Sequence, residues 1–339
     1  MNLAWFILLG GMLTVYAILD GFDLGIGTMH LALGKTDAER RTHLNVIGPF
    51  WFGYEVWLIA AGGSMVAAFP RLYAASFSGF YLVLTLVLWL LIARGSAIEF
   101  RSHVASPLWR GFFDTLFCVS SLLLAVLFGA AVGNVVRGVP LDASGSFQGS
   151  FALALNPYAV LVGVLSAALL AMHGTLFLAY KTDGGQQARA RAWAGRLWLA
   201  VAALSVLVTV FSFGARPGLG ANFARWPFLA VLPLLAFVSL VTVRVFVGRG
   251  DNRRAVFASS AFLATLMGSA GASLFPLLLP RLGHAGEGLT VFNCAAPHHD
   301  LVTAFAANLV ALSIVTAYFI YIHRVFRGTV QAHPGEHGY

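Results

Sequence analysis

The sequence predicts an all-α integral membrane protein, and composition carries most of the argument. Of the 339 residues, 59% are hydrophobic and 10% are charged, and the mean hydropathy is +0.83. Soluble domains have about 45–50% apolar and about 25% charged residues, so a soluble core would not absorb this much apolar surface. Apolar stretches also recur nine times, each longer than the about 20 residues that cross a bilayer as a helix.

The nine stretches predict nine transmembrane helices, arranged as two four-helix bundles plus one extra helix. They are Leu3–Leu33, Val46–Phe69, Leu72–Ile98, Leu108–Val136, Pro157–Tyr180, Trp193–Phe213, Trp226–Val247, Val256–Leu279 and Leu301–Ile322. The longest segments outside them, Arg137–Asn156 and Leu279–Asp300, are too short to fold as domains. We therefore expect one polytopic membrane domain over residues 1–339.

The first stretch is expected to stay in the mature protein. No basic region precedes Leu3–Leu19 and no small-residue cleavage site follows it, as a secretory signal would require. The helical pattern instead continues through Asp20.

Basic residues predict the orientation in the membrane. The chain has 21 lysines and arginines and a net charge of +8. Only five of them lie on the side reached after even-numbered stretches, namely Arg71, Arg137, Arg216, Arg225 and Arg281. Because cytoplasmic loops are rich in Lys and Arg, the N-terminus is predicted outside and the C-terminus in the cytoplasm. The positive charge then serves topology and contact with anionic lipid, and nucleic-acid binding is not expected.

Carboxylates inside the predicted spans are candidates for a proton path, because charge within hydrocarbon is costly. Asp20 and Asp23 share one face of the first span, near its cytoplasmic boundary. Gly21 and Gly25 form a GxxxG step beside them, where another helix can approach closely. A polar network that only fixes helix packing is the alternative for this pair.

Glu55 is the deepest carboxylate, near the middle of the second span. An unpaired ionised Glu there is untenable, so Glu55 must be neutral, paired or hydrated. We expect it to handle protons or to lie at a subunit interface. Trp51 and Trp57 beside it are expected to pack structurally, and Asp114 in the fourth span is a further proton-path candidate.

Four other polar residues are expected to be structural. Arg94, Glu99 and Arg101 close the third span, and their spacing predicts pairing with other segments as a clamp at the cytoplasmic rim. His173 is expected to be a hydrogen-bonded interfacial histidine. No His, Cys or Met set has ligand spacing, so we predict no metal site and no catalytic residue in this chain.

The chain carries a series of short motifs. The first is Leu19–Gly27, LDGFDLGIG. Further motifs are Ile47–Pro49, Glu55–Leu58, Ala68–Pro70, Arg94–Gly95 with Glu99–Arg101, Trp109–Arg110 with Asp114, Gly133–Asn134, His173–Gly174 with Lys181–Thr182, and Leu289–Val291 with Asn293–Ala295. In sequence and in order, these motifs resemble subunit II of the cytochrome bd-type quinol oxidases, and Leu19–Gly27 is similar to the first-helix signature of that family.

The resemblance implies a heterodimer in the bacterial inner (cytoplasmic) membrane. Its larger subunit I would hold haem b and haem d-type groups, oxidise quinol and reduce dioxygen to water with cytoplasmic protons. This chain would stabilise that haem subunit. The resemblance also makes the chain a candidate for proton uptake and for holding a structural quinone, and it makes a small single-helix subunit a candidate partner.

The second-helix motif departs from the family pattern. The family usually has WDGNEVW, whereas this chain has WFGYEVW, so Phe52 stands at the carboxylate position and Tyr54 replaces the amide. Phe52 cannot carry a proton, which leaves open whether protons pass through Glu55 or entirely through subunit I.

Two alternatives therefore stay open. The first is a diverged paralogue with altered quinol or proton function. The second is a stand-alone proton-coupled transporter that uses Asp20, Asp23 and Glu55.

Overall fold

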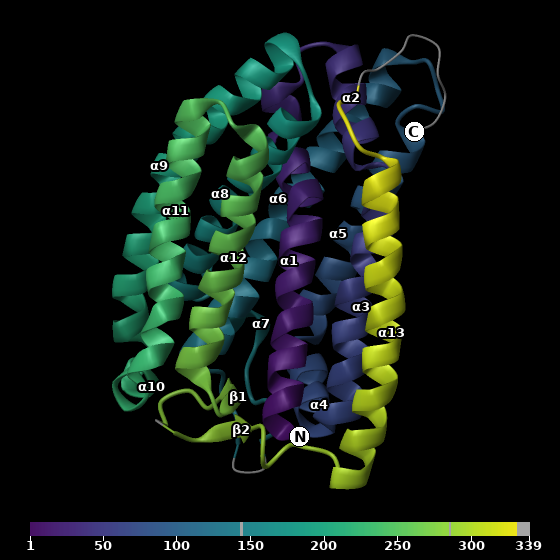
Figure 1. Cartoon of the computed structure of the whole chain (residues 1–339). Coiled ribbons are helices and arrows are strands. Elements are labelled where there is room, and N and C mark those ends of the chain that lie inside the picture. Colours follow the sequence, from purple (N-terminus) through teal and green to yellow (C-terminus); the bar gives the residue numbers. More distant parts are fainter. Residues whose placement is uncertain (143–144, 285, 331–339) are drawn as a thin grey trace.

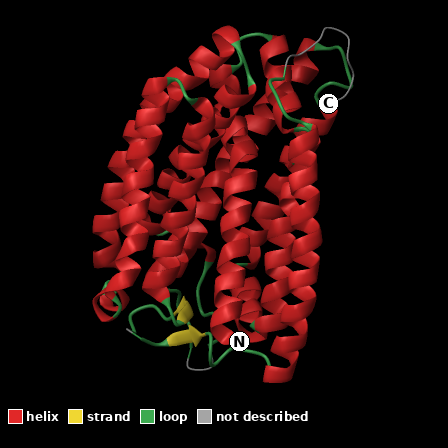
Figure 2. Cartoon of the chain, in the orientation of Figure 1, coloured by secondary structure: helices red, strands yellow, loops and turns green. Residues whose placement is uncertain are grey.

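The computed structural model describes residues 1–142, 145–284 and 286–330 and shows a tall bundle of helices with a small two-stranded sheet at one end (Figures 1 and 2). Within these residues, eight helices are long and apolar enough to cross a membrane, and the number is nine when one bent pair counts as a single span. The all-α membrane class and the nine predicted spans are thus confirmed.

The eight continuous spans are α1 (Asn2–Leu33), α5 (Tyr81–Phe100), α6 (Pro107–Arg137), α8 (Pro157–Lys181), α9 (Gly184–Ala215), α11 (Val231–Arg249) with the 3-10 turn η1 (Pro227–Ala230) before it, α12 (Asn252–Leu274) and α13 (His298–Val325). The bent pair is α2 (Asp37–Ile47) and α3 (Trp51–Ala68), which meet at 45°. The short helices α4 (Pro70–Gly79), α7 (Phe151–Ala154) and α10 (Ala221–Arg225) connect them.

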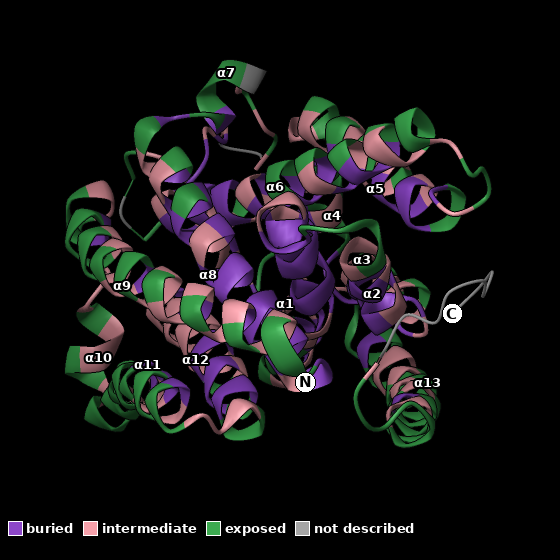
Figure 3. Cartoon of the chain, turned by 90° about the horizontal axis from the view of Figure 1, so that it is seen from above, coloured by how far each residue is buried: buried purple, intermediate pink, exposed green. Residues whose placement is uncertain are grey.

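The spans form two four-helix bundles and one further helix, as predicted. One bundle contains α1, α3, α5 and α6, and the other contains α8, α9, α11 and α12. Helix α1 lies in the middle and contacts α6 as well as α8, whereas α13 stands at the edge with α3 as its main contact (Figure 3). The start of α1 and the end of α13 lie at opposite ends of the bundle, in keeping with an odd number of spans (Figure 1).

Four predicted span boundaries were wrong. The second span is not one straight helix, because α2 begins at Asp37 with a capping box on Thr36 and the chain turns before Trp51. The third span begins only at Tyr81, because Pro70 starts the separate helix α4. The sixth span begins at Gly184, nine residues before the predicted Trp193, because the helix continues beyond the apolar stretch. The eighth span ends at Leu274, since the residue before a proline is disfavoured in a helix and Pro276 follows Phe275.

The residues after α12 form a strand instead of helix. Strand β1 (Leu277–Pro280) pairs antiparallel with β2 (Gly288–Thr290) at the end of the bundle where α1 begins (Figure 1).

Glycines let α1 lie directly against α8. A Cβ built on Gly25 would lie 1.9 Å from the carbonyl oxygen of Leu170, and one on Gly174 would lie 2.4 Å from the amide nitrogen of Ile26. The close approach that the GxxxG step predicted at Gly25 is therefore present, and its partner is α8.

Candidate functional site

The first of two buried ionic groups, here called the Arg94 cluster, joins three helices of the first bundle. It consists of Asp20 and Asp23 on α1, Glu55 on α3 and Arg94 on α5. Arg94 donates from Nη1 to Asp20 Oδ1 over 2.7 Å and from Nη2 to Glu55 Oε1. Asp20, Asp23 and Arg94 are fully buried, whereas the Glu55 side chain is 19% exposed. The shared arginine brings the carboxylates of two different helices to one level in the bundle.

The charges of the Arg94 cluster do not balance unless it holds protons. Two carboxylates bind the one guanidinium, a third carboxyl, that of Asp23, is buried one turn away on α1, and burying unpaired charge is costly. Both carboxyl oxygens of Asp23, and the hydroxyl of Tyr16 on the same helix, have no hydrogen-bond partner among the described residues. A cluster of this composition can take up and release protons, and Asp23 is its least compensated member.

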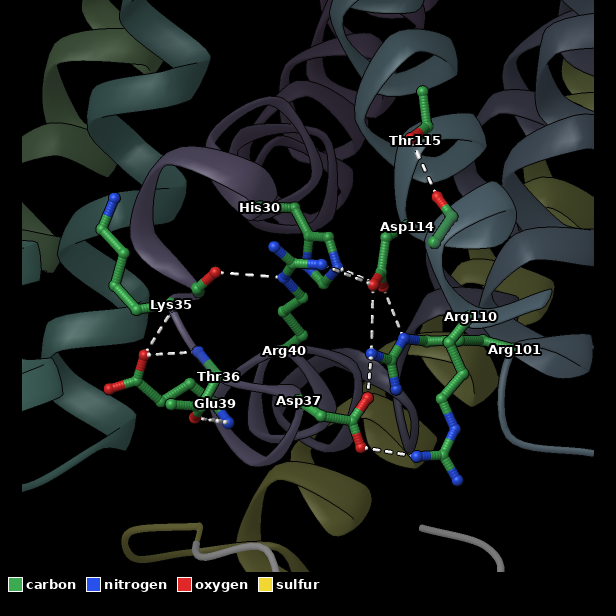
Figure 4. A network of polar contacts seen from close by, with 12 residues as sticks. His30, Lys35, Thr36, Asp37, Glu39, Arg40, Arg101, Arg110, Asp114 and Thr115 are labelled. Carbon is green, nitrogen blue, oxygen red and sulfur yellow. Dashed lines mark hydrogen bonds and ion pairs between the residues drawn. The ribbon is translucent and has the colours of Figure 1, made fainter. Parts of the chain in front are cut away.

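The second group, here called the Asp114 cluster, includes His30, which lies in the last turn of α1. Figure 4 shows its side chains. Asp114 on α6 is 1% exposed and accepts hydrogen bonds from three side chains. His30 Nε2 lies at 2.8 Å and Arg40 Nη1 at 3.1 Å, while Arg101 donates from Nε at 2.5 Å and from Nη2 at 3.1 Å. Both carboxylate oxygens are therefore fully used.

Outer members extend the Asp114 cluster to the rim of the bundle. Arg101 Nη2 also donates to Asp37 over 2.8 Å, and Arg110 donates to the other oxygen of Asp37 over 2.9 Å. Burial lowers the pKa of the Arg101 guanidinium, but the hydrogen bond and charge of Asp114 outweigh burial and raise that pKa above its usual value. The cluster ties α1, α2 and α6 to the turn between α5 and α6, which is the geometry of a structural clamp.

A histidine pair adjoins the clamp. The Nδ1 atoms of His30 and His43 lie 3.1 Å apart, so one ring donates to the other, and both side chains are fully buried. His43 was not among the predicted site residues. The hydropathy pattern does not predict α2. The one sequence feature that could have pointed to His43 is its position one helical turn after Glu39.

The three residues that were predicted to form a clamp at the end of the third span lie in three different places. Arg101 lies in the Asp114 cluster, whereas Arg94, two helical turns earlier, lies deeper in the Arg94 cluster. Glu99 is exposed at the end of α5. An arginine inside a span requires an acidic partner, so the position of Arg94 within the third span could have predicted its pairing with a buried carboxylate.

His173 joins three helices. Its Nε2 donates to the carbonyl of Ile18 on α1 over 3.0 Å, and its Nδ1 lies 2.7 Å from Ser259 Oγ on α12. The ring stacks on Phe22 with centroids 4.3 Å apart. Both ring nitrogens are engaged by the protein, so neither is free to bind a metal or haem.

The aromatic residues around Glu55 face different ways. Phe52 is 75% exposed, whereas Tyr54 is fully buried and its hydroxyl lies 3.2 Å from His323 Nε2 on α13. Trp51 packs against α5, where a Cβ on Gly95 would lie 3.2 Å from its ring, and Trp57 is buried. Within the described ranges, no group of three or more His, Cys, Asp or Glu side chains is placed to hold a metal ion.

Similarity to known proteins decides the family. Residues 1–326 match the family model described as cytochrome bd terminal oxidase subunit II. The chain belongs to this family. This bd oxidase subunit II is a multi-pass membrane subunit of a terminal oxidase, an oxidoreductase complex in which its partner is subunit I. The resemblance of its motifs to that family is thereby confirmed.

Relatives agree over nearly the whole length of the subunit. It is 31% identical to the cytochrome bd-I ubiquinol oxidase subunit 2 of Escherichia coli, over 93% of this chain and 91% of the relative. It is 32% identical to the cytochrome bd ubiquinol oxidase subunit 2 of Bacillus subtilis, over 96% of each chain. A chain of the bd oxidase structure from Geobacillus thermodenitrificans shares the fold, with a TM-score of 0.79, 20% identity, and coverage of 96% of this chain and 98% of that one.

Proposed function

We propose that this subunit stabilises the haem-bearing subunit I of a quinol-oxidising bd oxidase and contributes to proton uptake from the cytoplasm through the Arg94 cluster. The Escherichia coli and Bacillus subtilis relatives are named as ubiquinol oxidase subunits, which supports quinol as the electron donor. The observation that carries the proton role is a pair of carboxyls, Asp20 and Glu55, on one buried guanidinium, with the buried and unpaired carboxyl of Asp23 one turn from Asp20. Haem b and haem d-type groups belong in this proposal to subunit I.

The proposed location is the bacterial inner membrane, with the N-terminus outside and the C-terminus in the cytoplasm. The distribution of basic residues supports this orientation, because the Asp114 cluster and its arginines lie at the end of the bundle where α13 finishes (Figures 1 and 4). A small single-helix subunit and a structural quinone stay predictions from the family resemblance.

The proposed proton order follows α1 and then crosses to α3. His30 lies seven residues beyond Asp23, which is two helical turns on the same face, or about 10 Å. From Asp23 the proton order continues to Asp20 and then to Glu55, its one partly exposed carboxyl, while Arg94 stays protonated and holds these last two carboxyls together. Glu55 lies one turn from the exposed Phe52 on α3, so it is the member that a neighbouring subunit can reach.

An optical spectrum of the complex purified through this chain from native membranes tests the oxidase assignment. We expect reduced b- and d-type haem bands and a larger co-purifying membrane subunit. A haem-free preparation of this chain alone would contradict the proposal and favour the transporter alternative. A haem-bearing complex without quinol-dependent oxygen consumption would instead favour the diverged paralogue.

Substitution of the cluster carboxyls tests the proton role. Glu55→Gln and Asp23→Asn should each slow quinol-dependent oxygen consumption about a hundredfold, because positioned proton-transfer groups typically contribute that much. The haem spectrum should be unchanged. Glu287→Gln, at an exposed carboxylate near β2, is the matched control and should have normal turnover. Normal turnover in both cluster variants would show that the protons enter through subunit I.

A further inference from the structure

A groove opens where the bend between α2 and α3, the end of α8 and the segment after α13 meet. Its volume is about 320 Å³, and its lining includes Asn45, Phe50, Lys181, Phe326 and Arg327. The segment after α13 is held against α8, because the Val330 amide donates to the carbonyl of Lys181 over 2.8 Å. The groove is separate from both ionic clusters.

The ammonium group of Lys181 reaches this groove and has no anionic partner among the described residues. Lys181 is 5% exposed, and its Nζ donates to the carbonyl of Phe326 over 2.7 Å. The rings of Phe50, Phe177 and Tyr180 lie 5.8–6.0 Å from Nζ. None of the ion pairs among the described residues includes Lys181. An ammonium has three donors, so hydrogen-bonding capacity remains for a ligand.

The chemistry of the lining selects an anion. Lys181 and Arg327 supply two positive charges, Asn45 supplies an amide donor, and no acidic residue is among the described residues that line the groove. A nearly buried ammonium whose protein partners are a carbonyl and ring faces is stabilised strongly by a negative charge. Phosphate is an anion with enough oxygens to accept from all three groups.

The position of the groove points to a lipid as the source of that phosphate. It lies at the end of α13, beside side chains that are left uncovered by this chain, such as Tyr321 at 66% and Val325 at 55% exposure. We propose that the groove binds the headgroup phosphate of an anionic phospholipid of the cytoplasmic leaflet, with its acyl chains along α13. The lipid would join the end of α13 to α8 and α2. This proposal does not depend on the proton role of the Arg94 cluster.

The chain offers a matched pair for the test, because Lys35 and Lys181 are its two lysines. The purified complex is titrated with phosphatidylglycerol, and bound lipid is counted by native mass spectrometry. Lys181→Gln should weaken the binding of one lipid about tenfold, the usual effect of losing a hydrogen bond to a charged group. Lys181→Arg should retain it, and Lys35→Gln, at an exposed rim position, should behave as the unmodified complex.

Two further arms identify the source of the anion. Excess inorganic phosphate should fail to displace the lipid; displacement would support the anion site but assign it to free phosphate. Equal phosphatidylglycerol binding by Lys181→Gln and Lys35→Gln would overturn the proposal. The proposal would also be overturned if lipid binding depended on Lys181 only in a chain shortened after Val330. That result would mean that the C-terminal residues occupy the groove in the full chain. Co-purification of subunit I shows in each case that the variant has folded.

Discussion

Replacement of Asp114 by leucine should prevent stable assembly of the complex. Asp114 is the acceptor for His30, Arg40 and Arg101, and its removal leaves buried positive charge without a partner. Breaking a buried ion pair in this way costs about 3–5 kcal/mol, a large part of the about 5–15 kcal/mol that stabilises a typical folded protein. The yield of subunit I co-purified with this chain, and the thermal stability of the complex in detergent, measure the effect.

The control for Asp114 lies at the edge of the same cluster. Asp37 pairs with Arg101 and Arg110, but its side chain is 53% exposed. Exposed ion pairs contribute about 1 kcal/mol or less, so Asp37→Asn should assemble almost normally. If Asp114→Leu assembles in normal yield and only its turnover falls, then Asp114 belongs to the proton path, as its position in the fourth span also suggested, and the clamp assignment is wrong.

The substitution Gly25→Ala should destabilise the subunit by about 3 kcal/mol or more. Overpacking of a core usually costs about 1–3 kcal/mol, and here the added methyl group meets backbone atoms of α8, which cannot rotate away as a side chain can. The nearest is the carbonyl oxygen of Leu170, at 1.9 Å from the new Cβ. The melting temperature of the complex, followed by loss of its haem absorbance, is the measurement.

Gly10→Ala provides the comparison for the crossing of α1 and α8. Gly10 lies on the same helix, and a Cβ there would have no atom within 4 Å. Alanine is a better helix former than glycine by about 1 kcal/mol, so this variant should be unchanged or slightly more stable. Equal melting temperatures for Gly10→Ala and Gly25→Ala would show that the two helices can separate without cost.

The spans could be predicted from sequence because the bilayer leaves the backbone few choices. Without water to satisfy its polar groups, the chain must form helices across the hydrocarbon region, and hydropathy alone marks them. The same argument fails at the rim. Helix α2 is polar and is stabilised by its Thr36 cap and by contacts with other helices, so hydropathy does not show it. Strand β1 was missed because its run of leucines is as apolar as a span.

The candidate site could be predicted in part. Asp20, Asp23 and Glu55 were found because a carboxyl inside a span is costly and therefore conspicuous. Their common partner could not be assigned, because the contact of Arg94 with α1 and α3 depends on how three helices pack. The link between Tyr54 and His323 was hidden for the same reason, since their segments are 269 residues apart.

The place of α1 between the two bundles has a consequence for how the subunit is made. Helix α1 leaves the ribosome before the other described helices, yet His173, which bonds to α1 at Ile18, follows 155 residues later. Ser259 on α12, which holds the other side of the same ring, is synthesised later still. Until then Gly25 of α1, which lies against Leu170 of α8 in the folded subunit, has no second bundle to pack against. Helix α1 is thus made before the other described helices but is among the last to complete its packing. A chain truncated before α8 should therefore be degraded faster than the full chain, because the packing of α1 is incomplete.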